Sequence, residues 1–321
     1  MIYNTLGKTG LQVSKMGFGC GPLGNEYGDL DKSEATRSVH AAIDGGINFF
    51  DTSPYYGRTL SETRLGEALR GKRHQVVLAS KGGRFDAPLE TGFDFSTGFD
   101  FSYNSIMRMC EESLQRLQTD YLDVYQLHDI EFGKREVVVE EGIRALHDLK
   151  QQGKVRFIGV TGYPVRLLRE MVETQDLDVT LSYAHANLMN QMMNDILVPA
   201  VKAKGLGLIN ASMTHLGILT HQGPQPWHPA PEVIKAAGRA AAKLCEERGA
   251  SLPELAIQFA LANEHVDVTL LGTRTTAELE ASLPLLDKPI EQELLAAVQE
   301  VIEPVKNMSW PSGYEEYWET S

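Results

Sequence analysis

The feature that most constrains the fold of this chain is a regular alternation of short apolar runs with segments of helical spacing. Asp31 supplies a capping side chain before an alanine-rich stretch, and Ser61-Glu62 opens a second helical segment at Thr63 to Leu69. Such alternation favours an α/β fold with a parallel sheet. Eight apolar runs bounded by glycine or polar residues lie at 13–20, 47–51, 76–81, 122–128, 155–160, 179–184, 206–211 and 268–272.

Eight strand–helix units favour a closed (β/α)8 TIM barrel over an open doubly wound sheet. The glycine-rich stretch 17–21 differs from the Gly-x-Gly-x-x-Gly fingerprint of dinucleotide-binding folds, and it fits a tight turn at the barrel end at least as well as a cofactor contact. Residues 2–13 predict a short N-terminal β-hairpin. A chain of 321 residues is long enough for two domains, but α/β barrels often use this length as one, so we expect a single barrel domain over 1–321.

Charge and composition exclude several classes of protein. The net charge of −13, with no cluster of Lys and Arg, argues against binding to nucleic acid. No apolar run approaches the roughly 18 residues of a membrane span, and the N-terminus does not resemble a signal peptide. We therefore expect a cytoplasmic protein without a membrane partner. Cys20, Cys110 and Cys245 have no paired spacing, which predicts reduced thiols and no metal.

Ionisable side chains follow three of the predicted strands at the point where each ends. Asp51 and the Tyr55-Tyr56 pair follow the run at 47–50, Lys81 follows 76–80, and His128 follows 122–127. Each alone has an ordinary explanation, such as a solvated charge, a turn or a core histidine. In a barrel, however, the strand ends at one face carry the active site, so their combination predicts a catalytic centre.

Asp51, Tyr56, Lys81 and His128, in this order and context, resemble the catalytic tetrad of the aldo-keto reductases. The resemblance covers nearly the whole chain and implies an oxidoreductase that uses NAD or NADP. Further similarity to the family lies at Tyr56-Gly57, Ser61-Glu62, 65–69 and Leu127-His128-Asp129, and similarity to its sugar dehydrogenases lies at 126–133, 155–162 and 227–231.

The four side chains suit proton transfer to or from an alcohol or carbonyl oxygen. A free tyrosine has a pKa of about 10, so its use as an acid or base needs a neighbour that favours the phenolate. The ammonium of Lys81 is such a neighbour for Tyr56, and Asp51 would hold that ammonium charged. His128 would hydrogen-bond the reacting oxygen. Hydride needs a nicotinamide, because no side chain stores one.

The resemblance also implies where the cofactor and the substrate bind. Thr161-Gly162 stands where many family members have Ser-Asn to hold the nicotinamide amide, with Ser182 or Tyr183 nearby. The helix start at 272–278 resembles the adenosine-phosphate segment, where Glu278 favours NAD although Arg274 suits a 2′-phosphate. The cofactor contacts expected from the resemblance are Thr161, Gly162, Ser182, Ser212, Met213, Thr214, Leu216, Gly272, Thr273, Arg274 and Glu278, and the expected pocket residues are Tyr55, Trp227 and Trp310.

Three long connections are expected at the C-terminal face of the barrel. The connection at 82–102 contains a tandem repeat, Thr-Gly-Phe-Asp-Phe-Ser at 91–96 and again at 97–102, which is either a tolerated extension or a gate for substrate. The connection at 221–231 carries Trp227 among prolines. The tail from Trp310 onward is either a pocket wall or a subunit contact, so the oligomeric state stays open.

The function expected from this resemblance is oxidation of an aldose at C1 to its lactone, with L-galactose, L-fucose or a related sugar as substrate. A general NADPH-dependent reductase of aldehydes and ketones is the alternative enzyme. A nucleotide-sensing regulatory subunit on the same barrel is a third possibility, because a fold does not fix a function. The intact tetrad argues against that third possibility.

Overall fold

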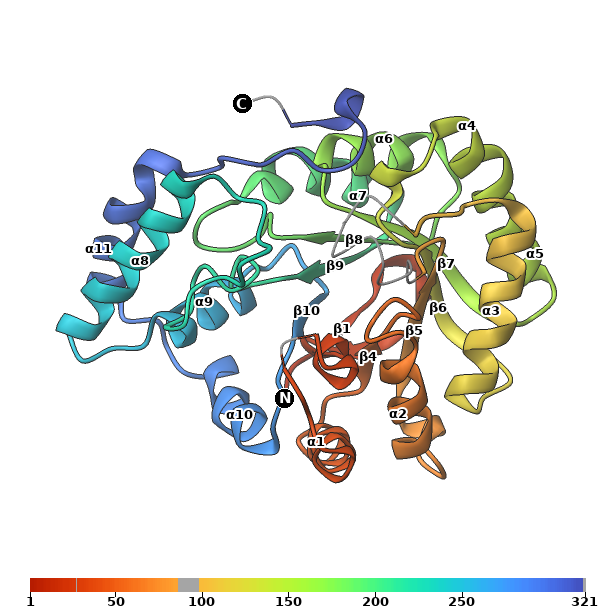
Figure 1. Cartoon of the computed structure of the whole chain (residues 1–321), viewed down its shortest axis with the longest axis horizontal. Coiled ribbons are helices and arrows are strands. Elements are labelled where there is room, and N and C mark those ends of the chain that lie inside the picture. The colour runs from red at the N-terminus through yellow and green to blue at the C-terminus, as the bar shows by residue number, and fades with distance from the viewer. Residues whose placement is uncertain (27, 86–97, 320–321) are drawn as a thin grey trace.

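The computed structural model describes residues 1–26, 28–85 and 98–319. Its centre is a closed barrel of parallel strands (Figure 1), in the order β10-β3-β4-β5-β6-β7-β8-β9. This confirms the predicted (β/α)8 barrel. The strands are β3 (Met16–Gly19), β4 (Phe49–Asp51), β5 (Val77–Gly82), β6 (Leu122–Leu127), β7 (Val155–Gly162), β8 (Val179–Tyr183), β9 (Gly207–Ala211) and β10 (Val268–Leu271).

The predicted N-terminal hairpin is present as β1 (Tyr3–Thr5) paired antiparallel with β2 (Gln12–Ser14), with Tyr3 opposite Ser14. Val13 and Ser14, the first residues of the apolar run at 13–20, pair with β1 in this hairpin, so the barrel strand β3 begins only at Met16. Leu6, Leu11 and Val13 of the hairpin pack with the side chains inside the barrel. The hairpin therefore closes one end of the barrel with apolar side chains.

Helices cover the outside of the barrel, and apolar clusters fill the space between helices and strands. Among the described residues, no helix is both long enough and apolar enough to cross a membrane. The helices are α1 (Lys32–Asp44), α2 (Leu60–Ala68), α3 (Tyr103–Leu117), α4 (Arg135–Val137), α5 (Arg144–Gln151), α6 (Val165–Thr174), α7 (Val198–Lys204), α8 (Glu232–Glu247), α9 (Leu252–Leu261), α10 (Thr276–Ser282) and α11 (Gln292–Ile302).

Two predicted helix starts differ in how well they match the structure. The carboxylate of Asp31 accepts hydrogen bonds from the backbone N–H groups of Ser33 and Glu34, which confirms it as the cap of α1. Helix α2 begins at Leu60, before the predicted opening. Ser61 lies inside that helix, and its hydroxyl donates to the backbone oxygen of Cys20 at 2.7 Å rather than capping α2.

Helices α8 and α9, which lie between β9 and β10, and helix α11, which follows β10, form a group at one side of the barrel, in which α11 packs along α8 (Figure 1). The tail after α11 then returns to the barrel near α6, where the backbone N–H of Arg166 donates to Glu319 at 3.0 Å. Of the tandem repeat, the first copy and Thr97 lie outside the described residues. Ser102, the last residue of the second copy, stands at the N-cap position of α3, but its side chain makes no capping hydrogen bond among the described residues.

Candidate active site

The ends of β4 and β5 bring three of the four predicted catalytic residues into contact. Lys81, on β5, is 1% exposed and its ammonium donates to the carboxylate of Asp51, the last residue of β4. The same ammonium donates to the backbone oxygen of Thr52 at 2.9 Å and to the phenol oxygen of Tyr56 at 3.2 Å. A buried cation thus lies between one carboxylate and one phenol.

His128, directly after β6, completes this group. Its ring lies edge-on to the ring of Tyr56, with 5.7 Å between the centroids, and edge-on to Tyr55 at 6.1 Å. Its Nδ1 lies 3.0 Å from the hydroxyl oxygen of Ser53. The structure therefore places Asp51, Tyr56, Lys81 and His128 together at one end of the barrel, with Tyr55 beside them.

Burial shifts the acidity of two of these groups. Loss of solvent raises the pKa of Asp51, and the nearby ammonium of Lys81 opposes that rise. Loss of solvent lowers the pKa of His128 well below 6.5, and the positive charges of Lys81 and Arg84 lower it further. At neutral pH the imidazole of His128 is therefore uncharged.

A second buried ion pair, absent from the expected site residues, lies beside the first. Arg84 follows β5 and donates to the carboxylate of Asp129, and both side chains are 5% exposed. The guanidinium also stacks over the ring of Tyr55, 3.6 Å from its centroid. This pair fixes the ring that was expected to line the pocket. Sequence reasoning missed Arg84 because its partner, Asp129, is distant in sequence.

Glu131 is a further buried carboxyl at this end of the barrel that the expected residues do not include. Its Oε1 accepts from the backbone N–H of Tyr163 at 3.1 Å, the hydroxyl of Ser312 at 3.0 Å and the phenol of Tyr183 at 3.3 Å. Burial, together with the negative charge of Asp129, raises the pKa of Glu131 to about 8. Glu131 thus joins the ends of β7 and β8 to the C-terminal tail.

The surroundings of Glu131 explain the departure from Ser-Asn at Thr161-Gly162. A Cβ atom at Gly162 would lie 2.9 Å from Oε2 of Glu131, so a carboxyl occupies the space that a side chain at 162 would need. The hydroxyl of Thr161 accepts from the backbone N–H of Asp129 at 3.0 Å. Thr161 therefore holds the turn after His128 in place.

Several buried polar atoms at the ends of the last three strands have no partner among the described residues, which is unusual in a folded protein. They include the hydroxyl oxygens of Ser182 and Thr273 and the side-chain oxygen of Asn210. A ligand with amide, hydroxyl and phosphate groups would satisfy such atoms. The residues present therefore fit a nicotinamide dinucleotide.

The segment after β9 contains four of the cofactor contacts expected from the resemblance, Ser212, Met213, Thr214 and Leu216. Ser212, His215 and Leu216 all have positive φ, between 53° and 57°, a conformation that is costly for residues with a side chain and is found often at ligand-binding loops. Met213 is buried in the core between barrel and helices, whereas Thr214 is half-buried. Met213 and Thr214, two of the expected cofactor contacts, thus differ in exposure.

At the start of α10, the amide groups that were expected to receive an anion already bind carboxylates of the protein. The backbone N–H of Arg274 donates to Glu278 at 2.8 Å, and its guanidinium lies 3.4 Å from the same carboxylate. The backbone N–H of Thr276 donates to Glu34 of α1 at 2.6 Å. Two negative charges therefore flank the loop that begins at Gly272.

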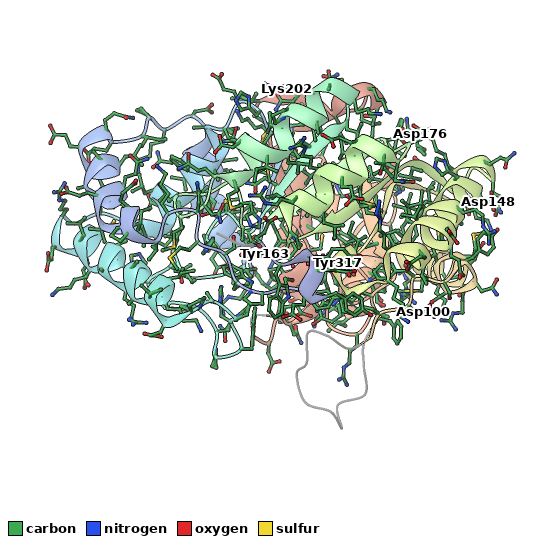
Figure 2. All side chains as sticks on the ribbon, turned by 90° about the horizontal axis from the view of Figure 1, so that it is seen from above. Asp100, Asp148, Tyr163, Asp176, Lys202 and Tyr317 are labelled. Atoms are coloured by element: carbon green, nitrogen blue, oxygen red, sulfur yellow. The ribbon has the colours of Figure 1, made fainter. Side chains whose placement is uncertain are left out.

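The two expected pocket tryptophans meet around His228. Trp227 stacks on its ring with an interplanar angle of 5°, and Trp310 approaches it edge-on with 5.1 Å between centroids. Trp310 is 4% exposed and also stacks on Tyr163, which Figure 2 labels. The structure thus buries Trp310 in an aromatic cluster, whereas Tyr55 lies next to the tetrad.

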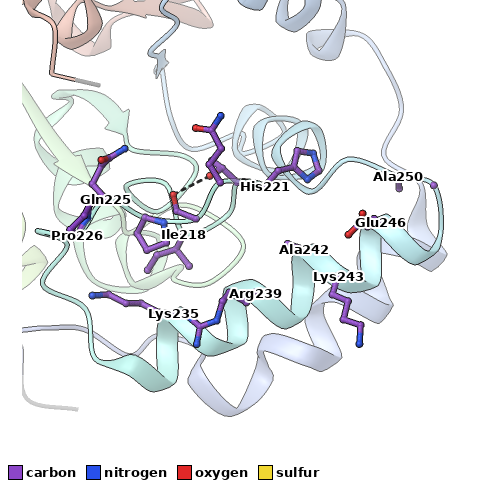
Figure 3. A pocket seen from close by; sticks show the side chains of 15 residues that line it. Ile218, His221, Gln225, Pro226, Lys235, Arg239, Ala242, Lys243, Glu246 and Ala250 are labelled. Carbon is purple, nitrogen blue, oxygen red and sulfur yellow. Dashed lines mark hydrogen bonds between the residues drawn. The ribbon is translucent and has the colours of Figure 1, made fainter. Parts of the chain in front are cut away.

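One cavity lies apart from these groups. It is an open groove of about 870 Å³ between residues 218–226 and α8, lined by Lys235, Arg239 and Lys243 among others (Figure 3). None of the tetrad lines it. Within the part of the chain that the structure describes, no three His, Cys, Asp or Glu side chains are grouped to hold a metal ion.

Comparison with known proteins identifies the class. The model of the aldo/keto reductase family matches residues 15–303, and the chain belongs to this family. It is therefore an oxidoreductase of CH–OH or C=O groups that uses a nicotinamide cofactor. The chain is 42% identical to L-galactose dehydrogenase of Arabidopsis thaliana over 96% of both chains.

Two further relatives agree with this assignment. D-arabinose 1-dehydrogenase of Saccharomyces cerevisiae is 32% identical over 84% of this chain and 82% of its own. The holo form of an aldo-keto reductase from Bacillus halodurans superposes with a TM-score of 0.77 and 26% identity, over 99% of both chains.

Proposed function

We propose that this protein oxidises an aldose at C1 to the lactone, with Asp51, Tyr56, Lys81 and His128 as catalytic residues. The observation that carries the proposal is the contact of Lys81 with both Asp51 and Tyr56, beside His128. The similarity to sugar dehydrogenases supports the substrate class. The buried free thiols of Cys20, Cys110 and Cys245 fit the reducing cytoplasm expected from the sequence.

In this proposal Tyr56 accepts the proton of the C1 hydroxyl. The ammonium of Lys81, 3.2 Å from the phenol oxygen, favours negative charge on that oxygen, and Asp51 keeps the ammonium charged and oriented. His128 donates a hydrogen bond to the substrate oxygen and fixes its position. A bound nicotinamide would supply the acceptor for the hydride that leaves C1.

A substrate screen tests the proposal. L-galactose, L-fucose, D-arabinose and a set of simple aldehydes and ketones would be assayed in both directions with NAD and NADP. We expect the highest kcat/KM for oxidation of a free aldose. A higher kcat/KM for reduction of non-sugar aldehydes by NADPH would support the general reductase instead, and absence of turnover with every substrate would support a regulatory subunit.

We further propose that the protein prefers NAD to NADP. At the start of α10, the backbone N–H of Arg274 donates to Glu278 and that of Thr276 donates to Glu34. Glu278 also forms an ion pair with the guanidinium of Arg274. A 2′-phosphate at this loop would meet two carboxylates, whereas the hydroxyl groups of NAD would find acceptors. The two carboxylates thus disfavour an additional anion at the start of α10.

The ratio of kcat/KM for NAD to kcat/KM for NADP tests this preference. We expect the parent ratio to exceed one, and Glu278→Arg to lower it about tenfold or more, which corresponds to roughly 1.4 kcal/mol. Glu280→Arg on the same helix adds the same charge at an exposed position and serves as the control. A parent that prefers NADP, or equal effects of the two variants, would contradict the preference.

A further inference from the structure

Ser53 is a buried residue that neither the family resemblance nor the tetrad includes. It lies two residues after Asp51 and is 0% exposed. Its hydroxyl oxygen accepts the backbone N–H of Tyr55 at 3.1 Å and lies 3.0 Å from Nδ1 of His128. The hydroxyl therefore connects the loop that carries the tyrosines to the imidazole.

The proton on His128 has two possible positions. Because burial and the positive charges of Lys81 and Arg84 hold its pKa well below 6.5, the imidazole is neutral and carries one N–H. That hydrogen lies either on Nδ1, which faces Ser53, or on Nε2. Only Nε2–H leaves the ring able to donate a hydrogen bond on the side away from Ser53.

Two contacts decide between these positions. If Nδ1 carried the hydrogen, Ser53 would accept two N–H groups, and its own buried O–H would have no acceptor among the described residues, which is costly. On the opposite side of the ring, Nε2 lies 3.9 Å from a carboxylate oxygen of Asp129. A carboxylate attracts an N–H and repels a lone pair, so both contacts favour Nε2–H.

We propose that Ser53 donates its hydroxyl hydrogen to Nδ1 of His128 and so fixes the tautomer whose Nε2–H donates to the reacting oxygen of the substrate. Ser53 is then a positioning residue, since it acts through His128. The assignment of the tautomer follows from the contacts of Nδ1 and Nε2 and does not depend on the proposed function. Only its effect on the rate rests on the proposed function.

Nuclear magnetic resonance of the full chain with ¹⁵N-labelled histidine tests the tautomer directly. The signals of His128 are assigned by their loss in His128→Gln. At pH 7.5 we expect Nε2 protonated and Nδ1 unprotonated in the parent, and a mixture of both forms in Ser53→Ala. In the same variant kcat should fall about ten- to a hundredfold, whereas the Kd for cofactor should change less than about twofold.

Matched variants separate the hydroxyl from side-chain shape. Ser53→Thr and Ser53→Val have the same volume, but only threonine keeps the hydroxyl, so only Ser53→Thr should keep the parent tautomer and most of the rate. Ser38→Ala removes another buried hydroxyl, which donates to the backbone oxygen of Ala35, and should leave both unchanged.

Protonation of Nδ1 in the parent, or a parent-like spectrum of His128 in Ser53→Val, would overturn the proposal. If His128 showed the expected tautomer but the protein oxidised no aldose, the proposed function would be contradicted. The role of Ser53 in fixing the tautomer would still hold.

Discussion

The ammonium of Lys81 is costly to bury, because a buried cation is stable only with a well-placed anion. Asp51 provides that anion, and Tyr56 lies at the edge of the pair. Of the two neighbouring tyrosines, Tyr56 is thus the one whose phenol oxygen contacts the ammonium of Lys81. Tyr55 instead contacts Arg84 through the face of its ring.

This difference predicts unequal effects of removing the two phenol oxygens. Tyr56→Phe removes the proposed proton acceptor and should lower kcat by about 10²- to 10⁴-fold, with a small change in cofactor affinity. Tyr55→Phe keeps the ring over Arg84 and should lower kcat less than about tenfold. Steady-state kinetics and cofactor titration measure both. A larger loss in Tyr55→Phe would show that the wrong tyrosine was assigned.

Asp51, Lys81 and His128 could be predicted from the sequence because each directly follows an apolar run, whereas Tyr56 was chosen over Tyr55 through the family resemblance. Ser53, Arg84 and Glu131 could not be found in this way. Their partners are distant in sequence: Ser53 and His128 are 75 positions apart, Arg84 and Asp129 are 45 apart, and Glu131 and Tyr163 are 32 apart. Only the closure of the barrel brings these strand ends together.

Among the larger elements, the C-terminal tail contacts the barrel end at Glu131. Its backbone oxygen accepts from the N–H of Tyr314 at 2.9 Å, and its carboxyl accepts from Ser312. Gly313 lies between these contacts with a φ of 73°. A Cβ atom there would lie 2.2 Å from the backbone oxygen of Glu131, so only glycine fits.

Gly313→Ala should therefore release the tail without unfolding the barrel. We expect faster amide hydrogen exchange over 310–319 and a raised KM for substrate, with a change in the free energy of unfolding of at most about 2 kcal/mol. Gly249→Ala is the matched control. Gly249 also has a positive φ, 65°, but a Cβ atom there meets nothing within 4 Å. Equal exchange of the tail in both variants would contradict the proposed contact.

The strands were easier to predict than the boundaries of the helices. Each barrel strand is buried over most of its length, so its apolar run is visible in the sequence. Helix α2 was placed too late because Ser61 resembles a cap, yet its hydroxyl is used by the backbone of Cys20. Ser61 suits a helix start, but it lies inside α2, where its hydroxyl contacts the backbone of Cys20.

At the scale of the whole molecule, three buried histidines that pack on Tyr163 or Trp310 link folding to pH. Burial lowers the pKa of His185 and of His228 to about 4, and of His215 to about 3. In the unfolded chain each has a pKa of about 6.5. The unfolded state therefore binds more protons between these values, and the stabilisation is present above pH 6.5 and is lost as the pH falls towards 4.

Replacement of one of these histidines should weaken this dependence. His185→Gln should reduce the loss in free energy of unfolding between pH 7.5 and pH 5 by about 1 to 2 kcal/mol, whatever its effect at pH 7.5. Urea denaturation at the two pH values measures the difference. His74→Gln changes an exposed histidine and should match the parent. An unchanged loss in His185→Gln would show that this ring does not carry the effect.

The contact between Glu131 and Gly162 has a consequence for how this barrel can diverge. Gly162→Asn alone would place a side chain against the carboxyl of Glu131, whereas a shorter residue at 131 alone would leave Tyr163, Tyr183 and Ser312 without their shared acceptor. We therefore expect each single substitution to be harmful and the pair together to restore a packed strand end. Positions 131 and 162 are then expected to change together, because an exchange between Thr-Gly and Ser-Asn would otherwise pass through an unfavourable intermediate sequence.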